Sequence, residues 1–452
     1  RRAFQARVRQ QLVPGTYRAP VFVDYQFADE VTLPKEAAVD RLLHAPMKVE
    51  IPSDGRMHLS LEGANGWGYH SFNCTPEAMH GGLWAFLAST FVSSDPVNDG
   101  GWFAIDFQLP PGTWANPDHY MTSHSESWFI LTPACNALAL PLSRANFSRG
   151  YIEEMVAGWG DGNMMQGGAL SDIGEGTAIC NMEMCCTGAG AGFAQDGLDH
   201  ASCAWFPAVD MGAVEDWEAT EPLVYLGRTI KEDSAGMGRQ RGGLGFESLR
   251  MVWTDRLLLQ NVSDGAVFCN VGLYGGYPSG SGYRHLSKSN NLEELFASRS
   301  PYPTADWEQA SLAGEEILDN RGVTLLTEFE RHDLYLAIIK GGPGVGDPLE
   351  RVPQAVEADL SSGHLSTRAA TEVYGVVAED AQATAAQREQ LRETRRARAV
   401  PVREWMTVQR ERILRREFAE PVVEMYRSSM QLSDEWAAEY REFWALDEQF
   451  EF

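Results

Sequence analysis

The sequence has 452 residues, of which 44% are hydrophobic, and its formal net charge at pH 7 is −26, from 63 acidic and 37 basic residues. Such a chain can bury a sizeable core, and its length is typical of two to four domains at roughly 150 residues each. The acidic balance argues against nucleic acid and anionic membrane surfaces as partners, since both attract basic surfaces, and favours a soluble acidic protein of the cytoplasm.

The cysteine count and the hydropathy pattern indicate the redox compartment and bear on whether the chain spans a membrane. The seven cysteines are odd in number and few for the length, which argues against a disulfide framework and for a reducing compartment. No apolar run reaches the ~18 residues that a membrane span needs. The chain begins with "RRAFQARVRQ", without Met or an apolar signal segment, so we expect either a processed chain or a piece of a longer one.

The first half of the chain predicts strands around one long helix. Residues 1–12 resemble the end of a helix that Pro14 and Gly15 terminate. Strand-like runs then alternate with turns up to about residue 135, and "PEAMHGGLWAFLASTFV" is the strongest helix signal among them. From 136 to about 215, Gly, Met and Cys dominate, which indicates tightly turned backbone inside a fold.

The second half predicts more strands and then a helical tail. Strand-like runs such as "RLLLQNV" and "DLYLAIIK" return up to residue 346. Residues 352–377 predict two short helices broken by Ser-Gly, and residues 381–400 a charged, solvated helix or linker. Aromatic residues at helical spacing in 402–418 and 433–450 indicate packing against the body or a partner chain.

These elements predict an α+β fold: a strand-rich, mixed, mainly antiparallel body with interspersed helices and a helical carboxy-terminal extension. We expect three regions. Residues 1–135 are strand-rich with one helix, 136–346 hold a Gly-rich core and a second strand-rich region, and 347–452 form the helical extension.

The loop "GGPGVGDPLE", residues 341–350, follows a strand and precedes a helix, as a phosphate-binding loop would. A dinucleotide fingerprint needs a third glycine where Asp347 stands, and in a P-loop the lysine follows the glycines, whereas Lys340 precedes them. We therefore predict a conformational turn, with Asp347 as N-cap and Pro348 starting a helix.

Several clusters could bind a metal or act as acid and base. Cys180, Cys185, Cys186 and Cys203 lack the paired spacing of zinc knuckles, which favours buried thiols. "HYMTSHSES" places His119, His124 and Glu126 close together, as a metal site or a polar loop, and His70 among aromatic residues is typical of a partly buried histidine.

Three further patterns concern catalysis. "QDGLDH" brings Gln195, Asp196 and His200 near Glu183, where acid, base and backbone N–H groups could converge, although a turn uses the same residue types. No G-x-S-x-G elbow supports a serine hydrolase. Arg239, Arg241 and Arg250 surround glycines and either bind carboxylate or phosphate groups or flank a hairpin.

Taken together, "GRQRGGLGFESLR" and "GDPLERVPQAVEADLSSGHLSTRAATEVYGVV" resemble the hydantoinase B/oxoprolinase family. Within that family the chain is most similar to acetone carboxylase alpha subunits. The segments that carry this similarity run across nearly the whole chain: "PGTYR", "HAP" at His44, "WGYHSFN", "LPPGTWANPD", "RGYIEEMVAG", "QDGLDHA", "DMGAVEDWEATEPLVYLGR" and "VPVREWM".

The resemblance implies a ligase that joins acetone and bicarbonate to make acetoacetate, driven by ATP. It implies a cytoplasmic heterohexamer of alpha, beta and gamma subunits, with ATP on the beta subunit and manganese beside the site of carbon–carbon bond formation. The family's metal ligands lie in an amino-terminal half, in a stretch of the type H-P-x-D, which this sequence lacks. We therefore expect only the carboxy-terminal portion of such a subunit and assign no metal ligand.

The catalytic candidates are His200, Asp196, Glu183 and His70, on the hypothesis that Trp67–His70 and Glu183–His200 line one water-poor pocket. Two alternatives stay open: a hydantoinase- or oxoprolinase-type subunit of an ATP-dependent amidohydrolase, and a non-catalytic scaffold. "EPLVYLGR" and "WGYHSFN" favour the carboxylase, and the larger ketone acetophenone remains open as a substrate.

Overall fold

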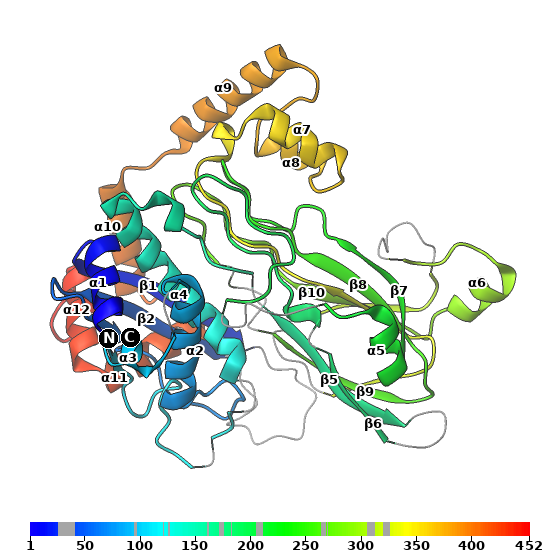
Figure 1. Cartoon of the computed structure of the whole chain (residues 1–452), viewed down its shortest axis with the longest axis horizontal. Coiled ribbons are helices and arrows are strands. Elements are labelled where there is room, and N and C mark those ends of the chain that lie inside the picture. Colours follow the sequence, from blue (N-terminus) through cyan, green and yellow to red (C-terminus); the bar gives the residue numbers. More distant parts are fainter. Residues whose placement is uncertain are drawn as a thin grey trace.

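The computed structural model describes residues 1–25, 41–94, 97–120, 122–124, 127–160, 162–170, 176–181, 183–204, 211–263, 268, 270–304, 312–319 and 326–452. It confirms the predicted α+β class, with three sheets that are mainly antiparallel and helices between and after them. Figure 1 shows two strand-rich bodies side by side, with α7, α8 and α9 above them.

The first body is built on a four-stranded sheet in the order β1-β2-β3-β4. Its long hairpin pairs β1 (Gly15–Tyr25) with β2 (Arg41–Ile51), while the shorter β3 (Met57–Ser60) and β4 (Ile105–Gln108) pair in parallel. Alternate side chains of β1 and β2 are buried in the main core, among them Val21, Val23, Leu43 and Met47, as expected of a sheet with one face on a core.

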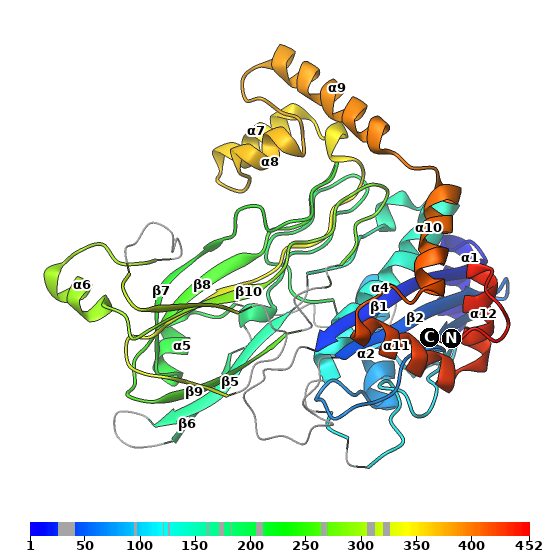
Figure 2. The same cartoon turned by 180° about the vertical axis from the view of Figure 1, so that it is seen from behind.

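Helices cover both faces of this sheet. The predicted helix near residue 80 is α2 (Pro76–Thr90), capped by Thr75 as sequence signals suggest, and α1 (Arg2–Gln11) confirms the predicted first helix. Figure 1 shows α2 and α4 in front of the β1–β2 hairpin, and Figure 2 shows α11 and α12 on the opposite side. The last helices therefore complete the layer that the first strands begin.

One long helix was not predicted. The sequence indicates tight turns from residue 136, but α4 (Ser127–Arg149) continues through that point, so this expectation is wrong for residues 136–149. Pro133 and Pro141 lie inside the helix, where proline normally signals a break. Most of its described side chains are buried, so no polar face reveals the helical period. The predicted limit at residue 135 therefore falls within α4.

The second body is a sandwich of two antiparallel sheets. The five-stranded sheet runs β11-β10-β13-β8-β7 and the four-stranded sheet β12-β9-β5-β6. A core that includes Met165, Phe246, Leu259 and Tyr335 fills the space between them. The two sheets consist of β5 (Asn163–Leu170), β6 (Gly176–Asn181), β7 (Leu223–Ile230), β8 (Phe246–Val252), β9 (Leu257–Ser263), β10 (Tyr283–Lys288), β11 (Glu315–Asp319), β12 (Thr327–Phe329) and β13 (Leu334–Ile338).

Strand β8 is the centre of this body, because all seven of its residues are buried. One of its faces contributes to the sandwich core. The other face places Leu249 and Met251 under α6 (Leu292–Ser298), whose Leu292 and Phe296 cover it. A polar side chain on β8 therefore needs a hydrogen-bond or ion-pair partner within the protein.

Between the two bodies, glycine-rich segments lie side by side. Gly243 donates its N–H to the carbonyl of Ala189 (2.7 Å), Gly342 to that of Gly243 (2.8 Å), and Gly236 to that of Gly342 (2.8 Å). A Cβ on Gly242 would lie 1.8 Å from the carbonyl oxygen of Gly342, so these backbones can approach only because side chains are absent. The Gly-rich pattern of the sequence is explained by this layer.

The loop at residues 341–350 belongs to the same layer and is the turn that we predicted. Gly346 has a φ of 77°, the Asp347 side chain accepts from Leu349 N–H (2.9 Å), and Pro348 starts the short 3-10 helix η4 (Pro348–Glu350). Its glycine backbone is hydrogen-bonded to neighbouring segments, so it does not form an open phosphate cradle.

The carboxy-terminal region is helical, as predicted. Gly363, with a φ of 73°, separates the two short helices, and no helix among the described residues is long and apolar enough to cross a membrane. The helices are α7 (Pro353–Ser361), α8 (Thr367–Glu372), α9 (Ala381–Arg398), α10 (Val402–Leu414), α11 (Glu420–Leu432) and α12 (Asp434–Trp444).

Candidate functional site

Glu183 occupies the centre of a buried charged cluster at one end of the sandwich. It begins the short helix η2 (Glu183–Cys185) just after β6, and its side chain is fully buried. One carboxylate oxygen accepts from Arg250 Nη2 (2.7 Å). The other accepts from the Tyr225 hydroxyl (2.9 Å) and from Arg228 Nη2. The carboxylate therefore joins β6 to β7 and β8.

Burial and the two neighbouring arginines shift the pKa of Glu183 in opposite directions. Burial alone would raise the pKa of Glu183, but the charges of Arg250 and Arg228, with hydrogen bonds from Ser248 and Tyr225, outweigh it and lower that pKa. Both guanidinium groups also lie against the Tyr225 ring, 5.0 Å and 5.2 Å from its centroid. Glu183 is thus ionised at neutral pH, pairs with the two guanidinium groups and is unsuited to donate a proton.

A second buried carboxylate extends the cluster. Asn181 donates to Glu221 (3.0 Å) and to the Tyr225 hydroxyl (3.0 Å). Burial raises the pKa of Glu221, and the nearby charge of Glu183 adds to the effect, while Asn181 and Arg250 oppose it. Two carboxyl groups with pKa values shifted in opposite directions therefore share one site, an arrangement that is frequent where proton transfer takes place.

His200 lies beside this cluster, linked to it through Arg228. Burial lowers the pKa of His200, and the positive charge of Arg228 adds to this, while Asp199 and the backbone of Gly245 oppose it. Its ring is 5.4 Å from that of Phe246, and its Nε2 is buried without a hydrogen-bond partner. His200 also has a φ of 51°, an uncommon conformation for a histidine. A neutral imidazole with an unused nitrogen can accept a proton.

Asp196 has a different environment. Its two carboxylate oxygens accept from both terminal nitrogens of Arg351 (2.7 Å each), and one also accepts from Arg241 N–H (2.9 Å). Arg351 in turn donates to Asp359 of α7 (2.8 Å). These bidentate contacts tie the "QDGLDH" turn to the carboxy-terminal helices. The geometry suits Asp196 to holding that turn in place.

His70 lies in the first body, away from the other three candidates. The Asn73 side chain donates to its carbonyl oxygen (2.9 Å) and to those of Gly68 and Ser123, and the His70 ring is 3% exposed. The structure places Arg228 against Glu183 and near enough to His200 for its charge to lower the pKa of that histidine. The sequence-predicted candidates Asp196 and His70 have other partners, Asp196 with Arg241 and Arg351 and His70 with Asn73.

The residues considered for a metal do not assemble one. His119 stacks on Trp67 (5.2 Å between ring centroids) and His124 contacts the Thr122 hydroxyl (2.9 Å), while Glu126 lies outside the described residues. Cys185 and Cys203 are buried, and their contact together with burial raises the pKa of the Cys185 thiol. Across the described ranges, no group of three His, Cys, Asp or Glu residues could hold a metal ion.

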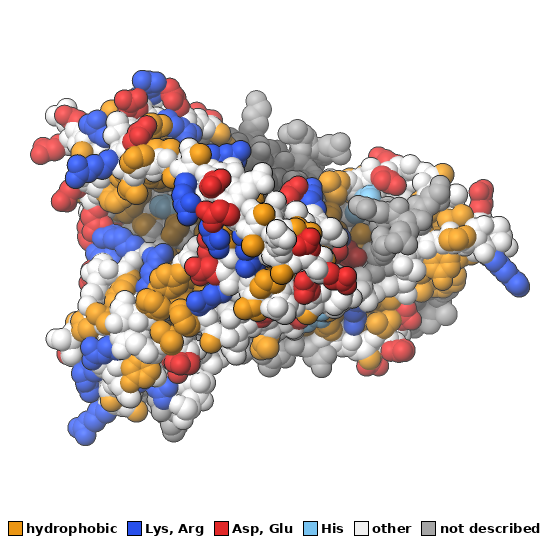
Figure 3. Space-filling view, turned by 90° about the horizontal axis from the view of Figure 1, so that it is seen from above, with side chains coloured by type: hydrophobic (Ala, Val, Ile, Leu, Met, Phe, Trp, Pro, Cys, Tyr) orange, Lys and Arg blue, Asp and Glu red, His pale blue; other side chains and the backbone are white. Residues whose placement is uncertain are grey.

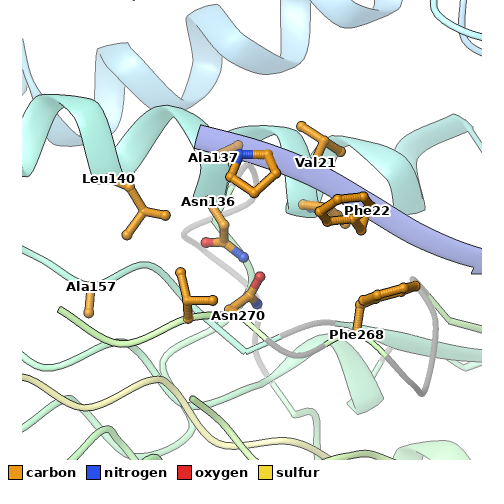
Figure 4. Close-up of a pocket in the computed structure, with 11 residues that line it drawn as sticks. Val21, Phe22, Asn136, Ala137, Leu140, Ala157, Phe268 and Asn270 are labelled. Atoms are coloured by element: carbon orange, nitrogen blue, oxygen red, sulfur yellow. The ribbon is translucent and has the colours of Figure 1, made fainter. Parts of the chain in front are cut away.

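A small cavity opens between the two bodies, where β1 and α4 face the segment after β9. Its volume is about 170 Å³ and its lining is mostly apolar. Phe22 stacks on Phe268 (5.3 Å), and Figure 4 shows the amides of Asn136 and Asn270 reaching into the same space. Both amides donate to the carbonyl of Trp159 (3.1 and 2.6 Å). None of the four catalytic candidates lines this cavity.

Sequence reasoning missed Arg228, Tyr225 and Glu221 as members of the charged cluster. All three belong to the stretch "EPLVYLGR", which we used only as a family signature. The signal was present, because a tyrosine and an arginine stand in the mainly apolar strand β7 and a glutamate comes just before it. Of the three arginines considered as an anion site, only Arg250 reaches Glu183, whereas Arg241 pairs with Asp199 and Asp359.

Comparison with known proteins places the chain among its relatives. The hydantoinase B/oxoprolinase family model matches residues 1–348. The acetone carboxylase alpha subunit of Xanthobacter autotrophicus is 41% identical over 467 aligned residues, which cover 99% of this chain and 60% of that protein. The acetophenone carboxylase delta subunit of Aromatoleum aromaticum is 27% identical, over 74% of this chain and 52% of its own length.

Two solved structures resemble the fold. A nucleotide-free acetone carboxylase superposes with a TM-score of 0.92 at 40% identity, over 99% of this chain and 61% of its own. An ATP-dependent caprolactamase from Pseudomonas jessenii superposes with a TM-score of 0.64 at 18% identity, over 86% of this chain and 62% of its own, and shows a shared fold alone.

This chain thus spans about three fifths of the length of the acetone carboxylase subunit that it matches. The similarity covers both bodies and the helical extension, since nearly every residue of the chain is aligned. The match of the family model over residues 1–348 shows that the chain belongs to the hydantoinase B/oxoprolinase family.

Proposed function

We propose that the chain is the carboxy-terminal portion of the large subunit of an ATP-dependent ketone carboxylase, which converts acetone and bicarbonate to acetoacetate. The observation that carries this proposal is the alignment to an acetone carboxylase alpha subunit at 41% identity over 99% of the chain. A caprolactamase beta subunit from Pseudomonas jessenii is more distant, at 26% identity over 62% of the chain, which makes an amidohydrolase subunit the second candidate.

The proposal includes partners and cofactors that this chain does not supply. We infer companion beta and gamma subunits in a cytoplasmic heterohexamer, with ATP on the beta subunit. Manganese would be held by the part of such a subunit that this chain does not span, where the family resemblance places the metal ligands. When bound there, the metal would stabilise negative charge that develops on the ketone oxygen.

His200 is the residue that we propose for proton transfer. Carboxylation of acetone removes a proton from a methyl carbon next to the carbonyl and forms a bond from that carbon to the carbon of bicarbonate, whose displaced oxygen leaves as phosphate after ATP has phosphorylated it. A neutral imidazole with a lowered pKa and an unpartnered Nε2 suits the first step. Glu183 would position Arg228 beside it, Asp196 would hold the turn that carries it, and His70 remains a candidate at a separate place.

The size and lining of the cavity suit a small ketone as substrate. Its volume of about 170 Å³ is below the roughly 300 Å³ at which pockets for drug-sized ligands begin. An apolar lining with two amides matches a small molecule with one polar atom. We therefore propose that small ketones pass through or rest in this cavity, and that acetophenone fits it less well than acetone.

The test is a reconstitution. The chain is co-purified with candidate beta and gamma subunits and the remaining part of the large subunit, and labelled bicarbonate fixation is measured with ATP and acetone. Fixation that needs both supports the proposal. ATP hydrolysis only with a lactam or hydantoin would move the chain to the amidohydrolases, and a complex without turnover of any of these would favour a scaffold.

The role of His200 has its own test in that complex. His200→Gln is expected to lower kcat about 10²- to 10⁴-fold, the usual range for a lost general base. His285→Gln, a partly exposed histidine on β10 that pairs with Glu316, is the matched control. Unchanged kcat in His200→Gln, at an unchanged melting temperature, would remove His200 from the mechanism.

A further inference from the structure

The junction between α9 and α10, residues 398–408, exposes an unusual amount of apolar surface. Val400, Val402, Trp405 and Val408 are 54%, 77%, 50% and 49% exposed. The last three stand three residues apart and so follow one side of α10, whose only buried residue is Ile413. Single exposed hydrophobic residues are ordinary, but a tryptophan and three valines within nine residues form a patch.

This junction is held firmly at both ends. On one side, Arg388 of α9 donates to the carbonyls of Arg351 (2.6 Å) and Tyr374 (3.0 Å), and Arg395 pairs with Asp347 (2.8 Å). On the other side, Arg410 donates to the carbonyls of Trp444 and Ala445 (3.0 and 2.8 Å). Figure 2 shows α10 standing at the edge of the molecule below α9. A patch fixed in this way loses little entropy on binding.

The charge of the junction is opposite to that of the rest of the chain. Residues 388–416 hold ten arginines against four glutamates, a net charge of +6 in a chain whose total is −26. The guanidinium groups of Arg398 and Arg403, next to the exposed valines, make no hydrogen bond or ion pair within the described part of the chain. Figure 3 shows basic side chains among hydrophobic ones on this side of the molecule.

We propose that the junction is a docking surface for an acidic face of a companion carboxylase subunit, with Trp405 in an apolar pocket at its centre. The inference rests on the proposed function. Tryptophan and arginine are the residues most enriched at the energetic centres of protein interfaces. A protein is favoured over an anionic membrane because the apolar side covers only two helical turns and the remainder of the chain would be repelled.

The experiment measures binding of the chain, co-purified with the remaining part of the large subunit, to separately purified beta and gamma subunits, by biolayer interferometry at 50 and 300 mM NaCl. Trp405→Ala is expected to weaken binding about 30-fold, the effect of an interface hot spot. Arg398→Glu with Arg403→Glu should slow association, and this effect should shrink in high salt.

Two controls match these changes elsewhere on the surface. Leu318→Ala removes a residue that is 69% exposed on β11, and Arg368→Glu reverses an exposed arginine on α8. Val402→Glu is a second test variant, because it places a charge in the patch without removing any buried group. Far-UV circular dichroism and melting temperature check that each variant is folded.

The outcomes separate the two proposals. If this preparation binds neither subunit, the docking surface is wrong, and the bicarbonate-fixation assay described above decides the carboxylase assignment separately. If it binds, but Trp405→Ala and Val402→Glu bind as tightly as the controls, the docking surface alone is wrong. Binding to phosphatidylcholine vesicles with one fifth phosphatidylserine that Val402→Glu abolishes, with subunit affinity unchanged, would assign the junction to a membrane instead.

Discussion

Glu183 shows how one buried carboxylate can organise three strands. Its partner Arg250 is fully buried, so water cannot replace the carboxylate there, whereas the Arg228 side chain is 19% exposed. Pairs of this kind contribute little compared with well-packed apolar residues, but breaking one leaves a buried charge without compensation. The cluster is therefore sensitive to single substitutions in a way that exposed ion pairs are not.

Glu183→Gln should lower the free energy of unfolding by about 3–5 kcal/mol, because it leaves the Arg250 charge uncompensated. Glu328→Gln, which breaks the exposed pair with Arg256, should cost less than about 1 kcal/mol. Urea unfolding at pH 7 measures both. Since the pKa of Glu183 is lowered in the folded chain, its contribution is present above about pH 4.3 and is lost as the pH falls below that value.

A smaller cost for Glu183→Gln than for Glu328→Gln would contradict the structure. That result would mean that water or another group reaches Arg250, which the buried position of β8 does not allow.

At the scale of elements, the glycine-rich segments depend on the absence of side chains. Gly242→Ala would place a Cβ 1.8 Å from a backbone carbonyl that cannot move without displacing its neighbours. We expect severe destabilisation, of more than about 3 kcal/mol, or failure to fold. Gly81→Ala is the matched change, because it lies in α2 with nothing within 4 Å of its Cβ, and it should stabilise by about 0.5–1 kcal/mol.

Melting temperatures of the two glycine variants give the comparison directly. Shifts of the same sign would show that helix propensity or chain entropy alone determines the effect, and that the close approach of the segments is not needed.

The elements also show what could be read from the sequence and what could not. The strongest helix signal of the first half, the Pro-led turn at Pro348 and the Gly-interrupted helices after residue 352 are local patterns, and each was predicted correctly. Helix α4 was missed because it is buried on most sides and contains two prolines, so neither period nor composition marks it.

The candidate site was predictable only where the partners were near in sequence. Glu183 and His200 were predicted because both adjoin the Gly-rich stretch. Arg228, which pairs with Glu183 and whose charge lowers the pKa of His200, lies on β7 and is distant from both in sequence, so no local pattern connects it to them. Strand order has no local signal, so the sequence could not show that Asp196 pairs with Arg351 or that Glu183 pairs with Arg228 and Arg250.

At the scale of the whole molecule, His44 couples the first sheet to the last helices. Its ring lies among Phe22, Tyr426 and Trp436, with centroids 5.0–5.8 Å apart. Burial lowers the pKa of His44 to about 3, opposed by a hydrogen bond to the backbone of Gly63. Since this pKa lies below the ordinary value, the neutral ring is needed for folding, and stability is lost as the pH falls below about 6.5.

We therefore expect the free energy of unfolding to fall by about 2 kcal/mol from this group between pH 7 and pH 5. His44→Phe should be less stable at pH 7, because the Gly63 carbonyl loses its partner, but should lack this pH dependence. His58→Gln, which removes an exposed histidine, should keep it. Urea titrations at several pH values provide the measurement, and an unchanged slope in His44→Phe would contradict the assignment.

The packing of α11 and α12 onto β2 also has a consequence for how the chain is made. The sheet between residues 15 and 108 leaves the ribosome more than 300 residues before Trp436, which packs against Gly63 with no room for a Cβ. Throughout synthesis, the face that carries His44 and Phe22 has no cover of its own. Contacts between residues so distant in sequence slow folding and leave aggregation-prone intermediates exposed. We therefore expect this chain to need chaperone protection until its last helices emerge.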